Sequence, residues 1–237
     1  MSTVEAGSRW SRRLALGAIA GPALFTAAWL ILGFASPGYT VSGTWISPYS
    51  PISQPISGLG LGKTAPYMNT AFVVSGLLLL AGVIGVARSL PAGGRPRTRP
   101  AIAALLALAP LGLIVVGLFD LEKMTMHLVG ATLILATPVI SFLVIGLHLR
   151  GVPGQRRFGN ALLLASPLTL VLFVVYNLSF DQAATAAGHG AAGLTQRVLF
   201  VEVLAWFVAM GWRASRAATH GRRENHMPTV DDPARGR

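Results

Sequence analysis

The sequence predicts an all-α integral membrane protein, a bundle of six transmembrane helices with both termini in the cytoplasm. Of its 237 residues, 53% are hydrophobic and only 11% are charged, and the mean hydropathy is +0.61. A soluble fold of this size cannot bury so much apolar surface. The apolar residues also form long uncharged runs separated by short segments that hold nearly all the arginines, which is the pattern of repeated membrane crossings.

The first apolar run covers residues 14–34 and follows Arg9, Arg12 and Arg13, so it resembles the charged start of a signal peptide. The apolar core of a signal is about 7 to 15 residues long, and this run is longer. We therefore expect a retained first span after a cytoplasmic segment, residues 1–13. The alternative is cleavage near residues 33–35, which would leave five spans with the same loop orientation.

Five more runs of suitable length follow the first. Each is close to the about 20 residues that a helix needs to cross about 30 Å of hydrocarbon. Only helices satisfy their own backbone groups there without closing a barrel. The remaining spans are expected at residues 66–87, 100–119, 125–149, 160–180 and 195–212, and prolines at positions 22, 110, 138 and 167 are expected to kink these helices or to permit close packing.

Orientation follows from the distribution of positive charge. Sixteen of the 19 basic residues fall in the N-terminal segment, the second-to-third and fourth-to-fifth connections and the C-terminal tail, and the opposite side carries only Lys63, Lys123 and Arg197. Positive charge marks the cytoplasmic face. The sequence thus predicts an external loop at residues 35–65, a disordered cytoplasmic tail at residues 214–237, and a cell-membrane location.

The net charge of +11 has the same explanation. Basic residues at the cytoplasmic face meet anionic lipid, so membrane lipids are the expected partners and nucleic acid is not. The chain has no cysteine, which excludes disulfides and thiolate metal sites. Abundant Arg, Ala and Gly suggest a bacterial source with a GC-rich genome. The sequence does not indicate an oligomeric state.

Five ionisable residues mark a candidate pocket near the outer side. Charged groups inside a membrane are costly and usually face a bundle interior or a cavity. Helix rise places these groups at similar depth beneath the 35–65 loop, and Asn69 is close to them. The candidate pocket comprises Asp120, Glu122, His127, Arg197, Glu202 and Asn69. A structural network that locks helix ends is the alternative interpretation of the same residues.

Two more specific chemistries have weaker signals. A zinc site needs about three protein ligands, and His127, His189, Asp120 and Glu122 form no compact motif, so neither a metal nor a cofactor is predicted. Ser57 precedes Gly58 and could act as a nucleophile with His127 as its base, although Gly-x-Ser-x-Gly is absent. Ser57 therefore joins the candidate pocket residues.

Three stretches together resemble the bacterial membrane proteins known as the domain of unknown function 998 family. In the stretch at residues 117–120, the family commonly has a proline after Gly-x-Phe, with an acidic residue nearby. Here Asp120 stands in the place of that proline and Glu122 follows. The resemblance therefore does not decide which of the two carboxylates has the family's acidic role. The resemblance implies a six-helix membrane fold and no established activity. The stretches are residues 49–53 and 57–60 with Asn69 and Gly76, residues 117–120 with His127, Gly130 and Ala131, and residues 193–197 leading into Trp206.

These observations support three classes of function. The leading hypothesis is a multi-pass membrane protein that binds or transports a small polar or lipid-headgroup ligand through an outward-facing polar pocket. The second is an intramembrane lipid-modifying or hydrolytic enzyme that uses His127 and a carboxylate. The third is a structural or assembly protein without pocket chemistry. The sequence does not decide whether the protein is an enzyme.

Overall fold

The computed structural model describes residues 3–46, 48–90 and 98–216. Six of its helical segments are long and apolar enough to cross a membrane, which confirms the predicted all-α six-helix class. The candidate spans are Arg9–Ala35, Gly62–Ser89, Thr98–Leu118, Leu121–Arg150, Arg156–Ser179 and Ala192–Arg216. Tail residues 217–237 lie outside the described residues, as do six of the sixteen arginines that predicted orientation, at positions 95, 97, 222, 223, 235 and 237.

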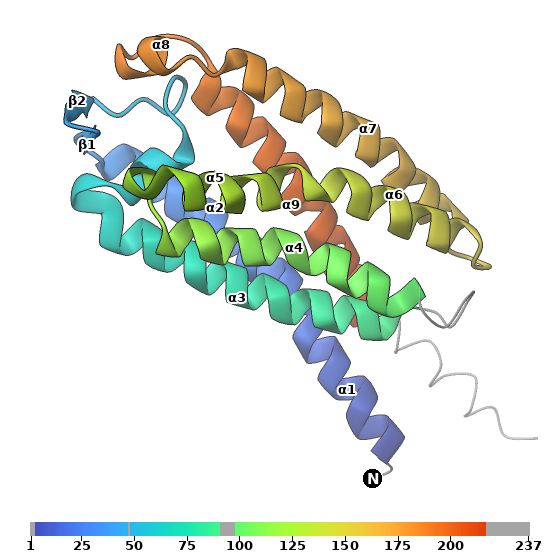
Figure 1. The fold of residues 1–237 in the computed structure, drawn as a ribbon. Coiled ribbons are helices and arrows are strands. Elements are labelled where there is room, and N and C mark those ends of the chain that lie inside the picture. The colour runs from blue at the N-terminus through green and yellow to red at the C-terminus, as the bar shows by residue number, and fades with distance from the viewer. Residues whose placement is uncertain (1–2, 47, 91–97, 217–237) are drawn as a thin grey trace, which may run out of the picture.

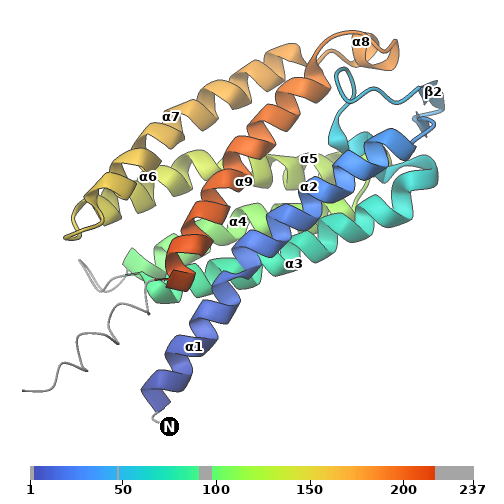
Figure 2. The same ribbon diagram turned by 180° about the vertical axis from the view of Figure 1, so that it is seen from behind.

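The helices run lengthwise in one bundle (Figure 1). Consecutive helices α2, α3, α4 and α5 pack side by side, and α9 crosses the bundle between α2 and α7 (Figure 2). The elements are α1 (Thr3–Ala15), α2 (Gly17–Ala35), β1 (Tyr39–Val41), β2 (Thr44–Ile46), η1 (Ile56–Gly60), η2 (Gly62–Thr64), α3 (Ala65–Ser89), α4 (Thr98–Leu118), η3 (Leu121–Lys123), α5 (Met124–Leu135), α6 (Thr137–Arg150), α7 (Arg156–Ser179), α8 (Gln182–Ala186) and α9 (Ala192–Arg216).

Two of the six crossings are interrupted. The fourth breaks at Ala136, between α5 and α6, because Pro138 has no N–H to donate back to the carbonyl of Ile134. The first breaks at Leu16, and α1 leaves the bundle at an angle (Figure 1). Residues 3–13, expected to be a segment outside the first span, are thus helical. The prolines at positions 22, 110 and 167 lie within continuous helices.

Small residues let neighbouring helices approach closely. A Cβ added to Gly21 of α2 would lie 2.7 Å from the Ser75 carbonyl oxygen of α3. A Cβ added to Gly112 of α4 would lie 2.5 Å from the Gly130 carbonyl oxygen of α5. Membrane helices associate largely through such van der Waals packing, so these glycines set the spacing of the α2–α5 layer.

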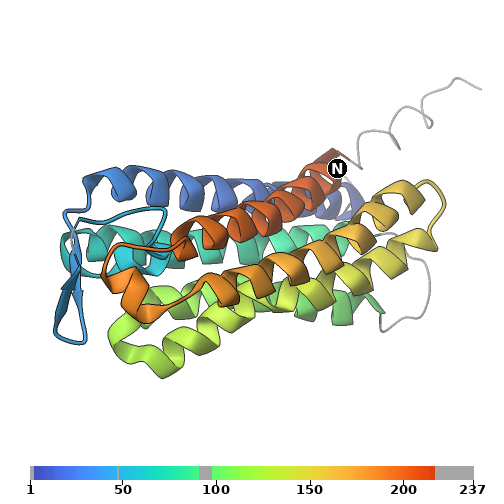
Figure 3. The same cartoon turned by 90° about the horizontal axis from the view of Figure 1, so that it is seen from above.

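The two ends of the bundle differ in structure. One end, called the loop end below, holds β1, β2, η1, η2, η3 and α8, and Figure 3 shows the hairpin and loop gathered there. The other end, called the arginine end, holds the last turns of α3 and α9 and the α6–α7 connection. The first turn of α4 also lies there, since the Arg99 guanidinium donates to the Leu90 carbonyl at the end of α3. The described arginines of this end include those at positions 88, 99, 150, 156, 157, 213 and 216.

The loop between α2 and α3 turns back into the bundle. It begins as an antiparallel hairpin that pairs Tyr39 with Ile46. Ser42 and Gly43 turn this hairpin with φ of 48° and 77°, as a two-residue turn of this kind requires. The loop then enters the helix ends, where residues 53–60 are all buried. The segment predicted as an external loop thus contributes Ile56 and Leu59 to the hydrophobic core.

Candidate functional site

The loop docks onto the first turn of α9. The Leu194 amide donates to the Ile52 carbonyl over 2.8 Å, and the Ile56 amide donates to Gln196 Oε1 over 2.7 Å. Gly193 permits this approach, because an added Cβ would lie 2.7 Å from the Pro51 oxygen and 2.8 Å from the Gln54 nitrogen. Residues about 140 positions apart in the chain thus form one interface, called the latch below.

Arg197 is the centre of the latch. Its Nη1 donates to the carbonyl oxygens of Pro51 (2.7 Å), Gln54 (3.0 Å) and Gly193 (2.9 Å). Its Nη2 donates to the Tyr49 hydroxyl over 2.5 Å. The residue is only 6% exposed, yet every oxygen it contacts within the described residues is uncharged.

Aromatic rings surround the same guanidinium. Arg197 Cζ lies 5.2 Å from the ring centroid of Trp29 and 5.9 Å from that of Tyr49, within the range of cation–π attraction. Burying a cation is costly unless it is paired and hydrogen-bonded. Carbonyl oxygens, the Tyr49 hydroxyl and ring faces offset that cost at Nη1 and Nη2, while Nε has no hydrogen-bond partner within the described residues. These contacts indicate a structural role for Arg197 in holding the loop.

Two loop tyrosines share this environment. The Tyr49 hydroxyl donates to the Pro55 carbonyl over 3.2 Å while it accepts from Arg197, and its ring lies 6.3 Å from that of Tyr39. Burial raises the pKa of both phenols above the ordinary value, and the positive charge of Arg197 opposes part of that rise at Tyr49. Both hydroxyls are therefore protonated at neutral pH.

Asn69 and Thr64 attach the other end of the loop. Asn69 Nδ2 donates to the Gly60 carbonyl over 3.1 Å, and Thr64 Oγ1 donates to the Leu59 carbonyl over 2.8 Å. Both bonds satisfy carbonyl groups of the η1 turn. Asn69 thus lies at the loop end, as the sequence suggested, and binds backbone there.

His127 and Ser57 line one small chamber at the loop end. The chamber has a volume of about 20 Å³, and Gln196 also contributes to its wall. A site needs about 10 to 15 Å³ to hold one water molecule. His127 is 5% and Ser57 8% exposed. The remaining lining is apolar: Ile56, Phe72, Val116, Ala131, Ile134, Leu135 and Phe200.

The His127 ring has a defined orientation. Its Nδ1 lies 2.9 Å from the Phe119 carbonyl oxygen, which can only accept a hydrogen bond, so Nδ1 carries a proton. In the neutral ring Nε2 is then an unprotonated acceptor. Within the described chain, neither His127 Nε2 nor Ser57 Oγ has a hydrogen-bond partner. The chamber therefore offers one acceptor nitrogen and one hydroxyl to a small polar group.

Asp120 and Glu122 lie at the surface of the loop end and serve the backbone. Asp120 caps η3 by accepting from the Glu122 amide over 3.1 Å. Glu122 accepts from the Ser42 amide at the tip of the hairpin over 3.0 Å. Neither carboxylate is hydrogen-bonded to His127, so each acts as a local cap in this conformation.

Glu202 lies apart from the chamber, between α7 and α9. Its carboxylate accepts from Thr169 Oγ1 over 2.9 and 3.1 Å and from the indole of Trp206 over 2.9 Å. Trp206, one turn along the same face of α9, packs against Phe142 and Phe158. Glu202 shares no hydrogen-bond partner with His127 and does not line the chamber.

The seven candidate residues thus divide into four groups. Arg197 and Asn69 bind the loop backbone, His127 and Ser57 line the chamber, Asp120 and Glu122 cap surface turns, and Glu202 bridges two helices. Across the described ranges, no three His, Asp or Glu side chains are grouped as a metal site requires. Gln196, which reaches both the loop and the chamber wall, was not predicted, although it precedes Arg197 in the third quoted stretch.

These features define a multi-pass α-helical membrane protein with an inward-folded loop that closes one end. The family model described as a protein of unknown function, DUF998, matches residues 19–213. The chain belongs to that family, which confirms the suspected resemblance. Comparison with curated proteins and with solved structures found no match. Two of the three stretches that carried the resemblance, residues 49–60 and 193–197, form the latch, and the third supplies Phe119 and His127.

Proposed function

We propose that this membrane protein binds a small polar ligand, either a free molecule or a lipid headgroup, in the chamber at the loop end. The observation that carries the proposal is the pair of polar atoms His127 Nε2 and Ser57 Oγ, which belong to buried residues, lack hydrogen-bond partners within the described chain and line the same cavity. Buried polar groups in folded proteins are nearly always hydrogen-bonded. A polar ligand atom placed between them would accept from Ser57 and donate to His127.

Access to the chamber would depend on the loop. In the closed form the volume suits about one water-sized group, so a larger ligand requires residues 53–60 to move. The latch contacts of Arg197 and Gln196 are the bonds that such a movement would break. The loop would then act as a lid, and the hydrogen bonds of Arg197 would hold it in place.

Native mass spectrometry of protein extracted in mild detergent tests the proposal. Wild-type protein is expected to carry a bound small molecule or lipid that His127→Ala and Ser57→Ala lose. Glu202→Gln is the matched control, since Glu202 does not line the chamber, and it should keep the ligand. An unliganded mass in the wild type, or equal loss in the control, would contradict the proposal and favour a structural protein.

A second candidate, a hydrolytic enzyme, rests on the same pair. Ser57 and His127 line one cavity, and a histidine fixed through Nδ1 can act as a base through Nε2. In the described chain, a backbone carbonyl rather than a carboxylate orients that ring. Labelling of Ser57 by a fluorophosphonate probe, abolished in His127→Ala, would support the enzyme. Unlabelled protein with bound ligand would support binding alone.

The placement in the cell membrane, with both termini cytoplasmic, belongs to the same proposal. It is supported by the excess of arginines at the arginine end. Because the chain has no cysteine, single cysteines at Ser42 and Gly151 report the two ends cleanly. In intact cells an impermeant thiol reagent should label the first and not the second, and the reverse result would invert the orientation.

A further inference from the structure

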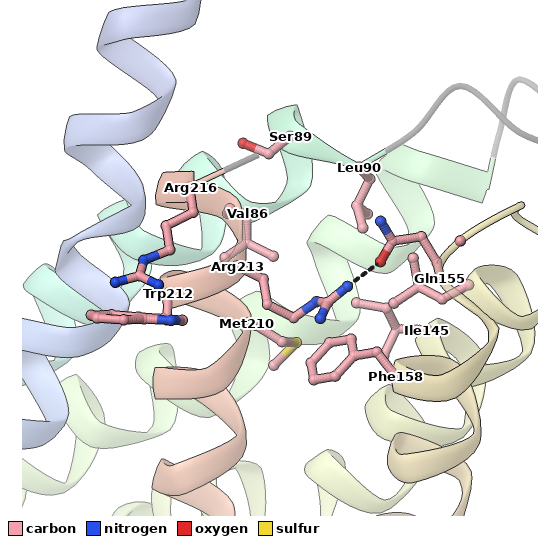
Figure 4. Close-up of a pocket in the computed structure, with 13 residues that line it drawn as sticks. Val86, Ser89, Leu90, Ile145, Gln155, Phe158, Met210, Trp212, Arg213 and Arg216 are labelled. Carbon is pink, nitrogen blue, oxygen red and sulfur yellow. Dashed lines mark hydrogen bonds between the residues drawn. The ribbon is translucent and has the colours of Figure 1, made fainter. Parts of the chain in front are cut away.

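A larger cavity lies at the opposite, arginine end. Its volume is about 700 Å³, and it opens between the ends of α3, α6, α7 and α9 (Figure 4). None of the candidate residues predicted from the sequence contributes to it. Its lining comprises Val86, Ser89, Leu90, Ile145, Leu149, Gly154, Gln155, Phe158, Met210, Trp212, Arg213, Ala214 and Arg216.

The lining is divided between apolar and polar groups. Val86, Ile145 and Met210 come from three different helices and form an apolar wall, and all three are buried. Polar side chains, including Arg213 and Gln155, lie among them (Figure 4). A cavity with both kinds of surface suits an amphiphile, whose tail and headgroup need different surroundings.

Arg213 is the main polar group of this cavity. Its Nη2 donates to Gln155 Oε1 over 2.6 Å, and its Cζ lies 4.5 Å from the ring centroid of Phe158. A guanidinium has five N–H donors. Within the described residues, the N–H that donates to Gln155 is the only one of the five with a partner. Arg213 is therefore held in place by Gln155 and Phe158 while most of its donors stay available.

The charge around the cavity is positive. Among the described residues that line it there is no carboxylate, and the Cζ of the second arginine, Arg216, lies 3.7 Å from the ring centroid of Trp212. Exposed arginines at positions 88, 150, 156 and 157 occupy the same end. Guanidinium groups bind phosphate oxygens strongly and with defined geometry.

We propose that this cavity binds the phosphate of an anionic phospholipid, with the headgroup on Arg213 and the acyl portion against Val86, Ile145 and Met210. The site is independent of the chamber at the loop end, and each can be lost without the other. Basic pockets between transmembrane helices are suited to such headgroups. The bound lipid would join the ends of α3, α6, α7 and α9, so it would also stabilise the bundle.

The test is a titration of the full-length protein with phosphatidylglycerol, followed by native mass spectrometry in detergent, and parallel titrations with zwitterionic phosphatidylcholine and inorganic phosphate. Phosphatidylglycerol should bind in preference to phosphatidylcholine. Arg213→Gln should weaken its binding about fivefold, since one arginine contributes modestly to anionic lipid affinity. Arg157→Gln is the matched control, because it removes the same charge from the same end outside the lining, and it should change binding less than about twofold.

Each alternative has a distinct result. Equal binding of the two lipids would make the cavity an unspecific apolar groove, and equal weakening by Arg213→Gln and Arg157→Gln would indicate diffuse attraction; either overturns the proposal. Inorganic phosphate that binds alone and displaces phosphatidylglycerol would assign the site to free phosphate rather than to lipid. Ile145→Phe, which reduces the cavity without changing charge, should weaken phosphatidylglycerol and leave phosphate binding unchanged if a lipid tail occupies it.

Discussion

The two ends of this bundle use arginine in opposite ways. At the loop end Arg197 is buried, and the loop supplies three of the four oxygens to which it donates. At the arginine end Arg213 is exposed, has one hydrogen-bond partner in the described chain and lines an open cavity. A buried guanidinium surrounded by backbone carbonyls therefore holds the fold, whereas an exposed guanidinium beside a cavity is available to a ligand.

The largest expected effect of a substitution comes from removing the buried arginine. Arg197→Ala leaves the carbonyls of Pro51 and Gln54 and the Tyr49 hydroxyl without their donor, and a buried group without a partner costs about 1 to 3 kcal/mol. The free energy of unfolding should fall by about 3 kcal/mol, measured as a lowered melting temperature in detergent. Arg213→Gln should lower it by less than about 0.5 kcal/mol. Equal losses of stability in Arg197→Ala and Arg213→Gln would contradict the different roles assigned to the two arginines.

A smaller loss is expected when the loop is displaced without removing a charge. Gly193→Ala places a methyl group 2.7 Å from the Pro51 oxygen and 2.8 Å from the Gln54 nitrogen. Overpacking of this kind costs about 1 to 3 kcal/mol. Gly151→Ala is the control, because its nearest atom, the His148 oxygen, is 3.6 Å away. If thermal denaturation shows the two alanine variants to be equally stable, the loop does not pack on α9 as described.

Glu202→Gln should have a lesser effect than either latch variant. The glutamine carbonyl can still accept from Thr169 or from Trp206, so most of the local hydrogen bonding is retained. The free energy of unfolding should change by less than about 1 kcal/mol. A larger loss, measured in the same melting assay, would show that the charge of Glu202 matters to the fold.

The smallest effect expected at neutral pH comes from ionisation of the loop tyrosines, which changes the stability only in alkaline solution. Burial raises the pKa values of Tyr39 and Tyr49 in the folded state, so each phenol binds its proton more tightly in the folded chain than in the unfolded chain. Their contribution is complete below the ordinary pKa of about 10 and is lost as pH rises through the folded-state values. Melting temperatures recorded from neutral to strongly alkaline pH should decline less steeply above pH 10 for Tyr39→Phe than for the wild type. Parallel curves would contradict the burial of that phenol.

Much of the fold could be predicted from local sequence. Long apolar runs predict membrane helices wherever they occur, and Pro138 coincides with the interruption of the fourth span. The break at Leu16 has no proline to mark it and was not expected. The extent of α1 was also not predicted, because its first residues are polar and carry no hydrophobic run.

The candidate site was harder to predict. The depth of a residue in the membrane follows from its position along its own helix, but the neighbouring helix that its side chain faces depends on how the whole bundle packs. Helix rise placed His127, Arg197 and Glu202 at similar levels, yet Glu202 faces Thr169 of α7 while Arg197 reaches the loop. The buried polar segment 53–57 carries no apolar pattern of its own. Its partners Gln196 and Arg197 lie more than 130 residues away, so only the folded chain brings them together.

Closure of the loop end by Arg197 is tested by the reactivity of a single cysteine at Ser57, because the chain has no native cysteine. Ser57 belongs to the inward-folded part of this loop and is 8% exposed. In detergent, thiol labelling of Ser57→Cys should be slow and should become at least about tenfold faster when Arg197→Lys is added, since local opening controls access. Ser89→Cys, at the open arginine-end cavity, should label at the same rate with either residue at position 197. Fast labelling of Ser57→Cys with Arg197 intact would contradict the claim that Arg197 closes the loop end.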